Sequence, residues 1–319
     1  MALASTQFAQ KIIGNIEKVV VGKRGAVSLL AIATLCDGHA LIEDVPGVAK
    51  TILVNSLAIS LGCKFTRIQC TPDLLPTDVT GVTIFNQKSS EFEFHPGPVF
   101  SQFILADELN RATPRTQSAL LEAMAEKQVT VDGVTRPLNR PFMVVATQNP
   151  IEHEGTFPLP EAQLDRFLMR ISVGYPSLEH ERTILEQQRR QHPIRSLQKI
   201  SSADELLAVQ EQIKSVHLHA SVQDYLLRIV HATRTHPDLA LGASPRGSLN
   251  LYRAAQAFAT LDGRDYVIPD DIKILAPAVL AHRLIVKPES RLKRRTPRNL
   301  IEEILQATPA PVNRPDWRQ

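Results

Sequence analysis

Residues 44–51 combine the residue types that a phosphate-binding loop requires. Such a loop turns tightly so that successive backbone N–H groups face the anion, and the positive end of a following helix dipole adds to the attraction. A lysine then supplies charge towards the outer phosphates, and a hydroxyl supplies a ligand for Mg²⁺. The residues that we predict to hold a nucleotide's phosphates are Pro46, Gly47, Val48, Ala49, Lys50 and Thr51, with Thr51 also at the metal.

The loop departs from the strict GxxxxGK[ST] pattern at two positions, because Asp44 and Ala49 stand where that pattern has glycine. Aspartate tolerates a left-handed backbone better than most residues, so Asp44 is compatible with the turn. Alanine adds only a methyl group, but its side chain disfavours positive φ, and we therefore expect φ below zero at Ala49. A loop this degenerate needs support from other residues.

Two carboxylates, Asp107 and Glu108, follow the apolar run at residues 103–106. A buried strand with this ending delivers both carboxylates to the carboxyl edge of a sheet, where ligands bind. There Asp107 is suited to hold the water shell of Mg²⁺, and Glu108 to orient and polarise an attacking water. A strand followed by an acidic helix cap is the alternative interpretation. Asn149, which ends another apolar run, could place its amide near the outermost phosphate or the water.

Short apolar runs alternate with helical patterns in the first half of the chain, which indicates a parallel sheet with crossover helices. Residues 50–59 are predicted to form a helix directly after the phosphate loop. The predicted strands are residues 39–43, 64–70, 103–106 and 141–147. The last two are apolar enough to be central in the sheet.

Two predicted hairpins interrupt this alternation. Residues 82–85 and 91–94 flank a polar turn. Residues 128–131 and 134–136 flank an Asp-Gly pair, which is typical of a type I′ turn. Neither hairpin belongs to a minimal doubly wound sheet, so we interpret both as insertions.

Helical patterning prevails after residue 176, and capping-box patterns at Ser202 and Ser221 predict two helix starts. We therefore divide the chain into three parts. An α/β domain covers residues 1–175, and a smaller all-helical lid covers residues 176–306. A proline-rich tail at residues 307–319 is expected to be disordered.

The composition excludes several classes of protein. Hydrophobic residues make up 43% of the chain and charged residues 22%, as in ordinary globular proteins. The formal net charge of +3 is too small to indicate a nucleic-acid partner. The basic run at residues 291–295 lacks interleaved aromatic residues, which favours a solvated helix face or a subunit contact. No apolar run approaches the roughly 20 residues of a membrane helix, and the first residues lack a signal-peptide pattern, so we expect a cytoplasmic location.

Several short motifs, taken in order, resemble those of the MoxR family of AAA+ ATPases. The resemblance begins with residues 41–51, including both departures from the strict loop pattern. It continues through residues 107–112, 116–124, 146–150, 155–167, 243–246, 269–272 and 282–283. Each motif is short, but their order and spacing are specific and cover most of the chain.

The resemblance implies roles that spacing alone does not assign. Val21 and Gly22 match the segment that lies against the adenine, and Asn149 matches the sensor-1 position. Arg166 matches the arginine finger, which completes the active site of a neighbouring subunit. Arg246 matches sensor 2, through which the lid responds to the γ-phosphate. The two hairpins match the helix-2 insert and the pre-sensor-1 hairpin of the same clade.

The fold class that the resemblance implies is an α/β P-loop NTPase of the AAA+ type followed by a smaller helical lid. The implied activity is Mg²⁺-dependent ATP hydrolysis in a homo-oligomeric ring, hexameric in this family, with ATP between the two domains and against the next subunit. The family's usual work is chaperone-like remodelling or maturation of a protein partner, often one with a von Willebrand factor A domain. Three alternatives stay open: a chelatase-type ATPase subunit, a DNA-remodelling motor, and a nucleotide-switched scaffold with little turnover.

Overall fold

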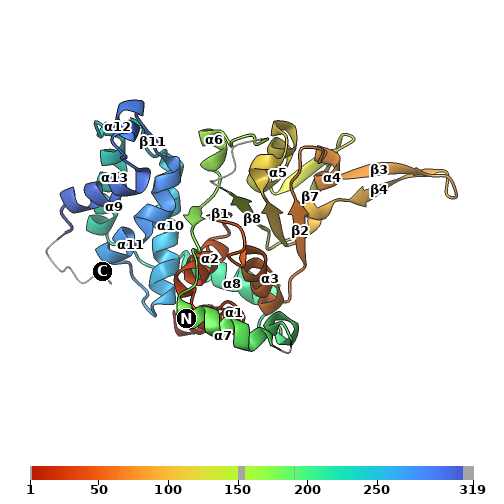
Figure 1. Cartoon of the computed structure of the whole chain (residues 1–319), viewed down its shortest axis with the longest axis horizontal. Helices are drawn as coiled ribbons and strands as arrows, with labels where there is room; N and C mark the ends of the chain where they lie inside the picture. Colours follow the sequence, from red (N-terminus) through yellow and green to blue (C-terminus); the bar gives the residue numbers. More distant parts are fainter. Residues whose placement is uncertain (1, 150–154, 190, 312–319) are drawn as a thin grey trace.

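A five-stranded parallel sheet forms the centre of the first half of the chain (Figure 1). The structure is a computed structural model that describes residues 2–149, 155–189 and 191–311. The strand order is β2-β5-β8-β1-β9, so β5 and β8 lie inside the sheet, as their apolar sequences predict. The strands are β1 Ala40–Glu43, β2 Phe65–Gln69, β5 Phe103–Asp107, β8 Met143–Gln148 and β9 Met169–Ile171.

The edge strand β9 was not predicted from the sequence. It has only three residues, too few for a periodic pattern to identify it. The strand forms because β1 offers a parallel edge on which Met169 and Ile171 become buried. Between them, Arg170 donates to the Glu43 carboxylate at 2.6 Å, which ties the ends of the two strands together.

Alternate side chains of the strands enter two different cores. Ala40 and Ile42 of β1 face helices α1, α2, α3 and α8, whereas Leu41 faces α5 on the other side of the sheet. This period of two is what a sheet buried on both faces requires. The covering helices are α1 Ala2–Glu17, α2 Arg24–Leu35, α3 Lys50–Leu61, α4 Pro76–Thr80, α5 Pro114–Glu126 and α8 Ala203–Ile213.

Both inserted hairpins are present. The first, β3 Gly81–Asn86 with β4 Glu91–Pro96, projects far from the sheet (Figure 1). The second joins β6 Gln128–Val131 to β7 Val134–Pro137. Its turn has φ of +52° at Asp132 and +75° at Gly133, which confirms the predicted type I′ geometry.

The lid is helical apart from a short antiparallel ribbon, β10 Leu239–Leu241 with β11 Ile285–Val286, which the sequence did not predict. The buried residues of the lid belong to the same apolar core as those of α1, α2 and α3, on one face of the sheet. The helix α8 also packs there, with Gln210 donating to the Thr34 carbonyl at 2.8 Å. Contacts therefore cross residue 175, and the boundary at that residue stays a prediction. The lid helices are α9 Ala220–Thr235, α10 Pro245–Leu261, α11 Pro269–Leu280, α12 Pro288–Leu292 and α13 Pro297–Ala307.

One of the two predicted capping boxes is present. Ser202 accepts from the Glu205 amide at 3.2 Å, and the Glu205 carboxylate accepts from the Ser202 amide at 3.3 Å. The prediction at Ser221 is wrong, because α9 begins at Ala220 and His219 is its N-cap. The His219 ring accepts from the Ser221 amide at 3.2 Å and so takes the position that a serine hydroxyl would fill.

The remaining elements are the helix α7 and several short turns of helix. They are η1 Pro98–Phe100, η2 Leu109–Arg111, α6 Glu161–Leu164, α7 Leu178–Gln188, η3 Pro193–Ser196 and η4 Ala281–Arg283. Residues 312–319 of the predicted tail and Pro150 of the Asn149 motif lie outside the described residues. No helix in the described ranges is long and apolar enough to cross a membrane.

A buried histidine joins the amino ends of the central strands. His39, just before β1, donates from Nε2 to the Met124 carbonyl at 3.1 Å and accepts at Nδ1 from the Val144 amide at 3.0 Å. Because one ring nitrogen faces an acceptor and the other a donor, the pair of contacts requires the neutral tautomer. Burial accordingly lowers the pKa of His39 from 6.5 to about 4.

Stability should therefore fall in mild acid. Between pH 6.5 and 4, His39 is protonated in the unfolded chain but stays neutral in the folded chain. The contribution of neutral His39 to the unfolding free energy is therefore complete above pH 6.5 and is lost as the pH falls towards 4. The shift corresponds to about 3 kcal/mol. Urea unfolding of the wild type and of His39→Gln, which does not titrate, should give a shallower pH dependence for the variant. Equal dependence in both proteins would contradict the assignment.

Candidate functional site

The predicted phosphate loop connects the carboxyl end of β1 to the first residue of α3. Gly47 has φ of +84° and Ala49 has φ of +60°. The expectation of negative φ at Ala49 is thus wrong. Ala49 is the N-cap of α3, and a left-handed backbone there turns neighbouring amides towards a common centre, which accounts for the positive φ despite its cost in alanine.

The loop has the properties that phosphate binding requires. No side chain in the described part of the chain caps α3, so its first amides are available to an anion. A Cβ placed on Gly47 would meet open space, which leaves room for a ligand beside the loop. The Lys50 ammonium donates to the Asp44 carbonyl at the start of the loop, at 2.5 Å. Burial lowers the pKa of Lys50, while Asp44, Asp107 and Glu108 act in the opposite direction.

Asp44 anchors the loop to the end of β9. Its Oδ2 accepts from the Val173 and Gly174 amides, each at 2.6 Å, and from the Ser172 hydroxyl at 3.1 Å. Its Oδ1 accepts from the Val45 amide at 2.8 Å. Burial opposes ionisation of this carboxyl, but these donors together hold the pKa of Asp44 below its usual value. Asp44 has no positive φ in the structure, so its carboxylate and not its backbone explains why glycine is absent here.

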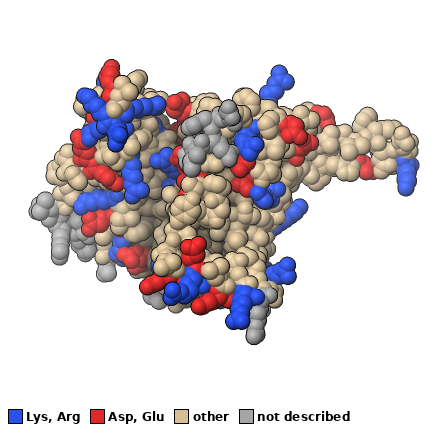
Figure 2. Space-filling model, viewed as in Figure 1, with Lys and Arg blue, Asp and Glu red and all other residues tan. Residues whose placement is uncertain are grey.

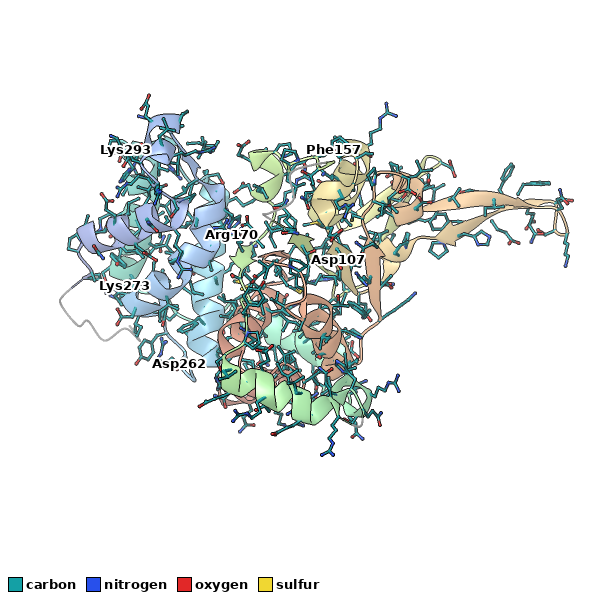
Figure 3. All side chains as sticks on the ribbon, viewed as in Figure 1. Asp107, Phe157, Arg170, Asp262, Lys273 and Lys293 are labelled. Carbon is teal, nitrogen blue, oxygen red and sulfur yellow. The ribbon has the colours of Figure 1, made fainter. Side chains whose placement is uncertain are left out.

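Asp107 ends β5 at the same edge of the sheet as the loop (Figure 3). Its Oδ1 accepts from the Thr147 hydroxyl of β8 at 2.6 Å. Its Oδ2 accepts from the Arg67 guanidinium of β2 at 3.0 Å and 2.6 Å. The charge of Asp107 also acts on Lys50, the neighbour of Thr51. Carboxylate and hydroxyl oxygens are donors that Mg²⁺ prefers, so Asp107 and Thr51 fit a magnesium ion.

Glu108 has φ of +56°, a conformation that costs energy in a residue with a side chain. The backbone is held there because the Glu108 amide donates to the Thr147 hydroxyl at 2.8 Å. Its carboxylate accepts from Gln69 at 3.3 Å and from Arg111 at 3.2 Å. One oxygen of Thr147 therefore holds the Asp107 carboxylate and the Glu108 backbone, a role that the sequence did not predict.

Two further predicted positions lie near this edge. Asn149 is buried just after β8, the strand between β1 and β5. Val21 and Gly22 lie between α1 and α2, where Gly22 has φ of +71° and would clash with the His180 ring if it carried a Cβ. Lys23 donates to the Tyr175 carbonyl at 2.6 Å, which holds this segment against the start of α7.

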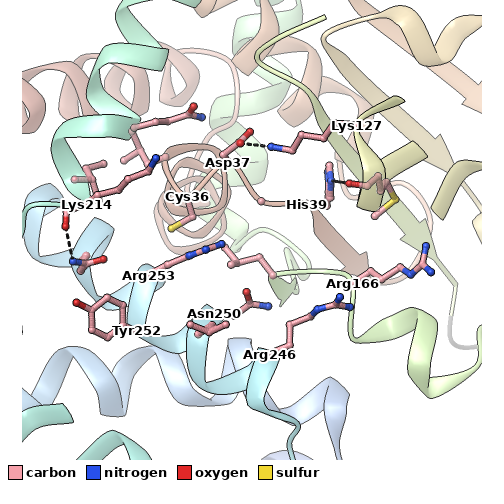
Figure 4. Close-up of a pocket in the computed structure, with 18 of the residues that line it drawn as sticks. Cys36, Asp37, His39, Lys127, Arg166, Lys214, Arg246, Asn250, Tyr252 and Arg253 are labelled. Atoms are coloured by element: carbon pink, nitrogen blue, oxygen red, sulfur yellow. Dashed lines mark hydrogen bonds and ion pairs between the residues drawn. The ribbon is translucent and has the colours of Figure 1, made fainter. Parts of the chain in front are cut away.

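The structure does not bring Arg166 and Arg246 to the loop of their own chain. Both line a cavity of about 720 Å³ together with residues 37–39, which precede β1, and residues 124–127 (Figure 4). This cavity therefore opens at the amino edge of the sheet, opposite to the loop. The arrangement differs from the expectation that the lid covers its own nucleotide. The cationic residues of the lining are Lys127, Arg140, Arg166, Lys214, Arg246 and Arg253.

The contacts of the two arginines differ. Arg166 donates to the Leu121 carbonyl of α5. Arg246, in the first turn of α10, lies 3.8 Å from the Asp165 carboxylate, and 52% of its side chain is exposed. Both guanidinium groups thus lie at the cavity, and Arg246 in particular stays accessible to a molecule that approaches this edge.

Two family models match the chain. Residues 39–169 match the ATPase family associated with various cellular activities (AAA), and residues 231–304 match the AAA lid domain. The first match includes the loop, both carboxylates and Arg166, and the second includes Arg246.

Individual relatives cover nearly the whole chain. The protein YeaC from Bacillus subtilis, described as uncharacterized, is 51% identical over 95% of each chain. Chaperone MoxR1 from Mycobacterium tuberculosis is 44% identical over 97% of this chain and 84% of its own. A crystal structure of a candidate ATPase from Cytophaga hutchinsonii has a TM-score of 0.90 and 43% identity over 96% of this chain and 95% of its own.

The anchoring of the loop by Asp44 predicts a specific loss in Asp44→Asn. An amide in place of the carboxylate presents N–H to donors that need an acceptor, which costs about 1–3 kcal/mol of unfolding free energy. Because the loop loses its tether, a fluorescent ATP analogue should also bind more weakly. Asp78→Asn, which changes a carboxylate that caps α4, is the matched control and should leave nucleotide binding unchanged. Wild-type stability and affinity in Asp44→Asn would refute the anchoring role.

Proposed function

The chain belongs to the MoxR family of AAA+ ATPases, and from that premise we propose that it hydrolyses Mg²⁺-bound ATP in a ring of its own copies. The observation that carries this proposal is the meeting of three groups at one edge of the sheet. The loop with Lys50 follows β1, and Asp107 ends β5 with Glu108 directly after it. Thr147 of β8 joins the Asp107 carboxylate to the Glu108 amide.

Each residue at this edge has a proposed task. The loop amides and Lys50 bind the phosphates, and Thr51 and Asp107 hold the metal. Bound Mg²⁺ supplies positive charge that offsets the charge on the phosphoryl oxygens. Glu108 orients the attacking water, because Thr147 holds its backbone and Gln69 and Arg111 donate to its carboxylate. Asn149 contacts the water or the outermost phosphate, and Val21 and Gly22 border the adenine.

We propose that Arg166 and Arg246 both act on the nucleotide of a neighbouring subunit. They lie at the amino edge of the sheet, whereas the loop lies at the carboxyl edge. A contact between these two unlike edges is heterologous, and such contacts close into a ring when the rotation allows it. A planar, permanently charged guanidinium suits the γ-phosphate oxygens as charge builds up during hydrolysis. A hexamer is the expected ring because it is the family's usual assembly.

The proposed work of the ring is chaperone-like remodelling or maturation of a protein, such as one with a von Willebrand factor A domain. The projecting β3–β4 hairpin supports a protein partner, because its face in Figure 2 is mostly uncharged and it exposes Val82, Ile84, Phe85 and Phe92. Phe92 alone is 75% exposed. The paired carboxylates, with Asp107 held by Thr147 and Glu108 by Gln69 and Arg111, argue against a scaffold that hardly turns ATP over.

Binding and hydrolysis of ATP should separate in two variants. Lys50→Ala should lose both, because the loop loses the charge that faces the phosphates. Glu108→Gln keeps the shape of the side chain but not its charge, so it should bind ATP normally and hydrolyse it at least about tenfold more slowly, a barrier increase of about 1.4 kcal/mol. Nucleotide titration and phosphate release measure the two steps. Full turnover by Glu108→Gln would show that another group activates the water.

Action in trans predicts that two inactive variants restore activity when mixed. Arg166→Ala keeps an intact loop and Lys50→Ala keeps an intact arginine, so some interfaces of a mixed ring contain both. Phosphate release should therefore partly recover, and the specific activity of the wild type should rise with protein concentration. Subunit exchange is verified with labelled protein. Exchange without recovery would contradict action in trans, and full activity of Arg166→Ala alone would remove Arg166 from the site.

A further inference from the structure

We propose that Asp165 and Arg283 are positioning residues that couple the lid to Arg166, so that the lid of one subunit controls hydrolysis in the next. This inference rests on the proposed action of Arg166 in trans. Among the described contacts, neither residue bonds to the phosphate loop of its own chain. Their contacts instead surround the segment that carries Arg166 and connect that segment to two separate parts of the lid.

Arg283 clamps the backbone on both sides of Arg166. Its Nη2 donates to the Asp165 carbonyl at 3.2 Å and to the Phe167 carbonyl at 2.5 Å, and its Nη1 donates to the Leu168 carbonyl at 3.3 Å. Only 1% of the Arg283 side chain is exposed. Burial lowers the pKa of Arg283 to about 10, with Asp165 acting in the opposite direction, so the group is charged at neutral pH.

The Asp165 carboxylate joins this clamp to the first turn of α10. Its Oδ1 accepts from Arg283 Nε at 2.9 Å, and both oxygens accept from the Ser244 hydroxyl at 3.1 Å and 3.0 Å. Arg246 lies 3.8 Å from Oδ2. Ser244 is the N-cap of α10, yet in the described structure its hydroxyl donates to Asp165 and does not cap its own helix. A serine at this position ordinarily stabilises its helix, so its contact with Asp165 replaces a local stabilisation.

These contacts link the movement of the lid to that of the segment that carries Arg166. Arg283 belongs to η4, after α11, and Ser244 and Arg246 belong to the start of α10, so two lid elements hold one short segment of the α/β domain. A rotation of the lid must carry residues 165–168 with it or break a buried, charged hydrogen-bond network. Arg166 and Arg246 therefore move as one unit, and the position of the lid sets whether both reach the neighbouring nucleotide.

The test measures complementation by Asp165→Asn, which keeps the size of the side chain but removes its charge. With an intact loop, its KM for ATP should stay at the wild-type value, while kcat should fall about tenfold, because small displacements of a catalytic group are costly. Mixing it with Lys50→Ala should raise turnover, since the Lys50→Ala subunits supply correctly positioned arginines. Arg283→Lys, which keeps the charge but loses the fork, should show the same pattern.

Asp271→Asn is the matched control. Asp271 is another buried lid carboxylate, held by Arg264 at 2.8 Å and 2.6 Å, but it does not contact residues 165–168 in the described structure. It should lower the unfolding temperature without lowering kcat below that temperature. If Asp165→Asn does not fold, Ser244→Ala decides, because it removes only the hydroxyl: a complementable loss of kcat supports the coupling, and wild-type kcat overturns it.

The outcomes separate this inference from the proposed function. If Arg166→Ala complements Lys50→Ala but Asp165→Asn does not, the defect of Asp165→Asn lies in its own subunit's site or fold, and the coupling is overturned. Wild-type kcat in Asp165→Asn overturns it as well. If Arg166→Ala itself fails to complement, the action in trans is wrong and the coupling fails with it.

Discussion

The shared direction of the five strands is the constraint on which the rest of the structure depends. Because all strands are parallel, their carboxyl ends meet at one edge and their amino ends at the other. The loop, Asp107, Glu108 and Asn149 follow strands and so collect at the carboxyl edge. Residues 37–39 precede β1 and, together with the end of α5, line the cationic cavity at the amino edge. The distance between loop and arginines within one chain is therefore a property of the sheet.

Two strained residues at the carboxyl edge show how the sheet supports its site. Ala49 and Glu108 both have positive φ, which is unfavourable for residues with a side chain. Hydrogen bonds to other segments hold the loop that contains Ala49 and the backbone of Glu108. Asp44 fixes the loop to the end of β9, and Thr147 of β8 accepts from the Glu108 amide. The short strand β9 thus matters more for the loop than its three residues suggest, because it positions the amides that hold Asp44.

The amino edge is organised by the lid. The lid shares a continuous apolar core with α1, α2 and α3, and its buried Arg283 makes charged hydrogen bonds to the segment before β9. Such a buried charge is stable only when its donors are satisfied, and here carbonyls and a carboxylate satisfy them. The geometry between lid and sheet is therefore specific. The hydrogen bond between Ser244 and Asp165, which are 79 positions apart in the sequence, brings the neighbouring Arg246 and Arg166 to one cavity.

The sequence by itself determined the features that depend on neighbouring residues. Alternating apolar runs predict four of the five strands, the Asp-Gly pair predicts a type I′ turn, and the order of short motifs indicates the family. Tertiary structure alone decided the rest. The positive φ of Ala49 contradicts the local preference of alanine, and the loop that contains Ala49 is anchored through Asp44 by residues about 130 positions away. His219 replaces Ser221 as a helix cap through one ring nitrogen. The strand β9, the role of Thr147 and the position of Arg246 all require contacts between distant segments, which no local pattern encodes.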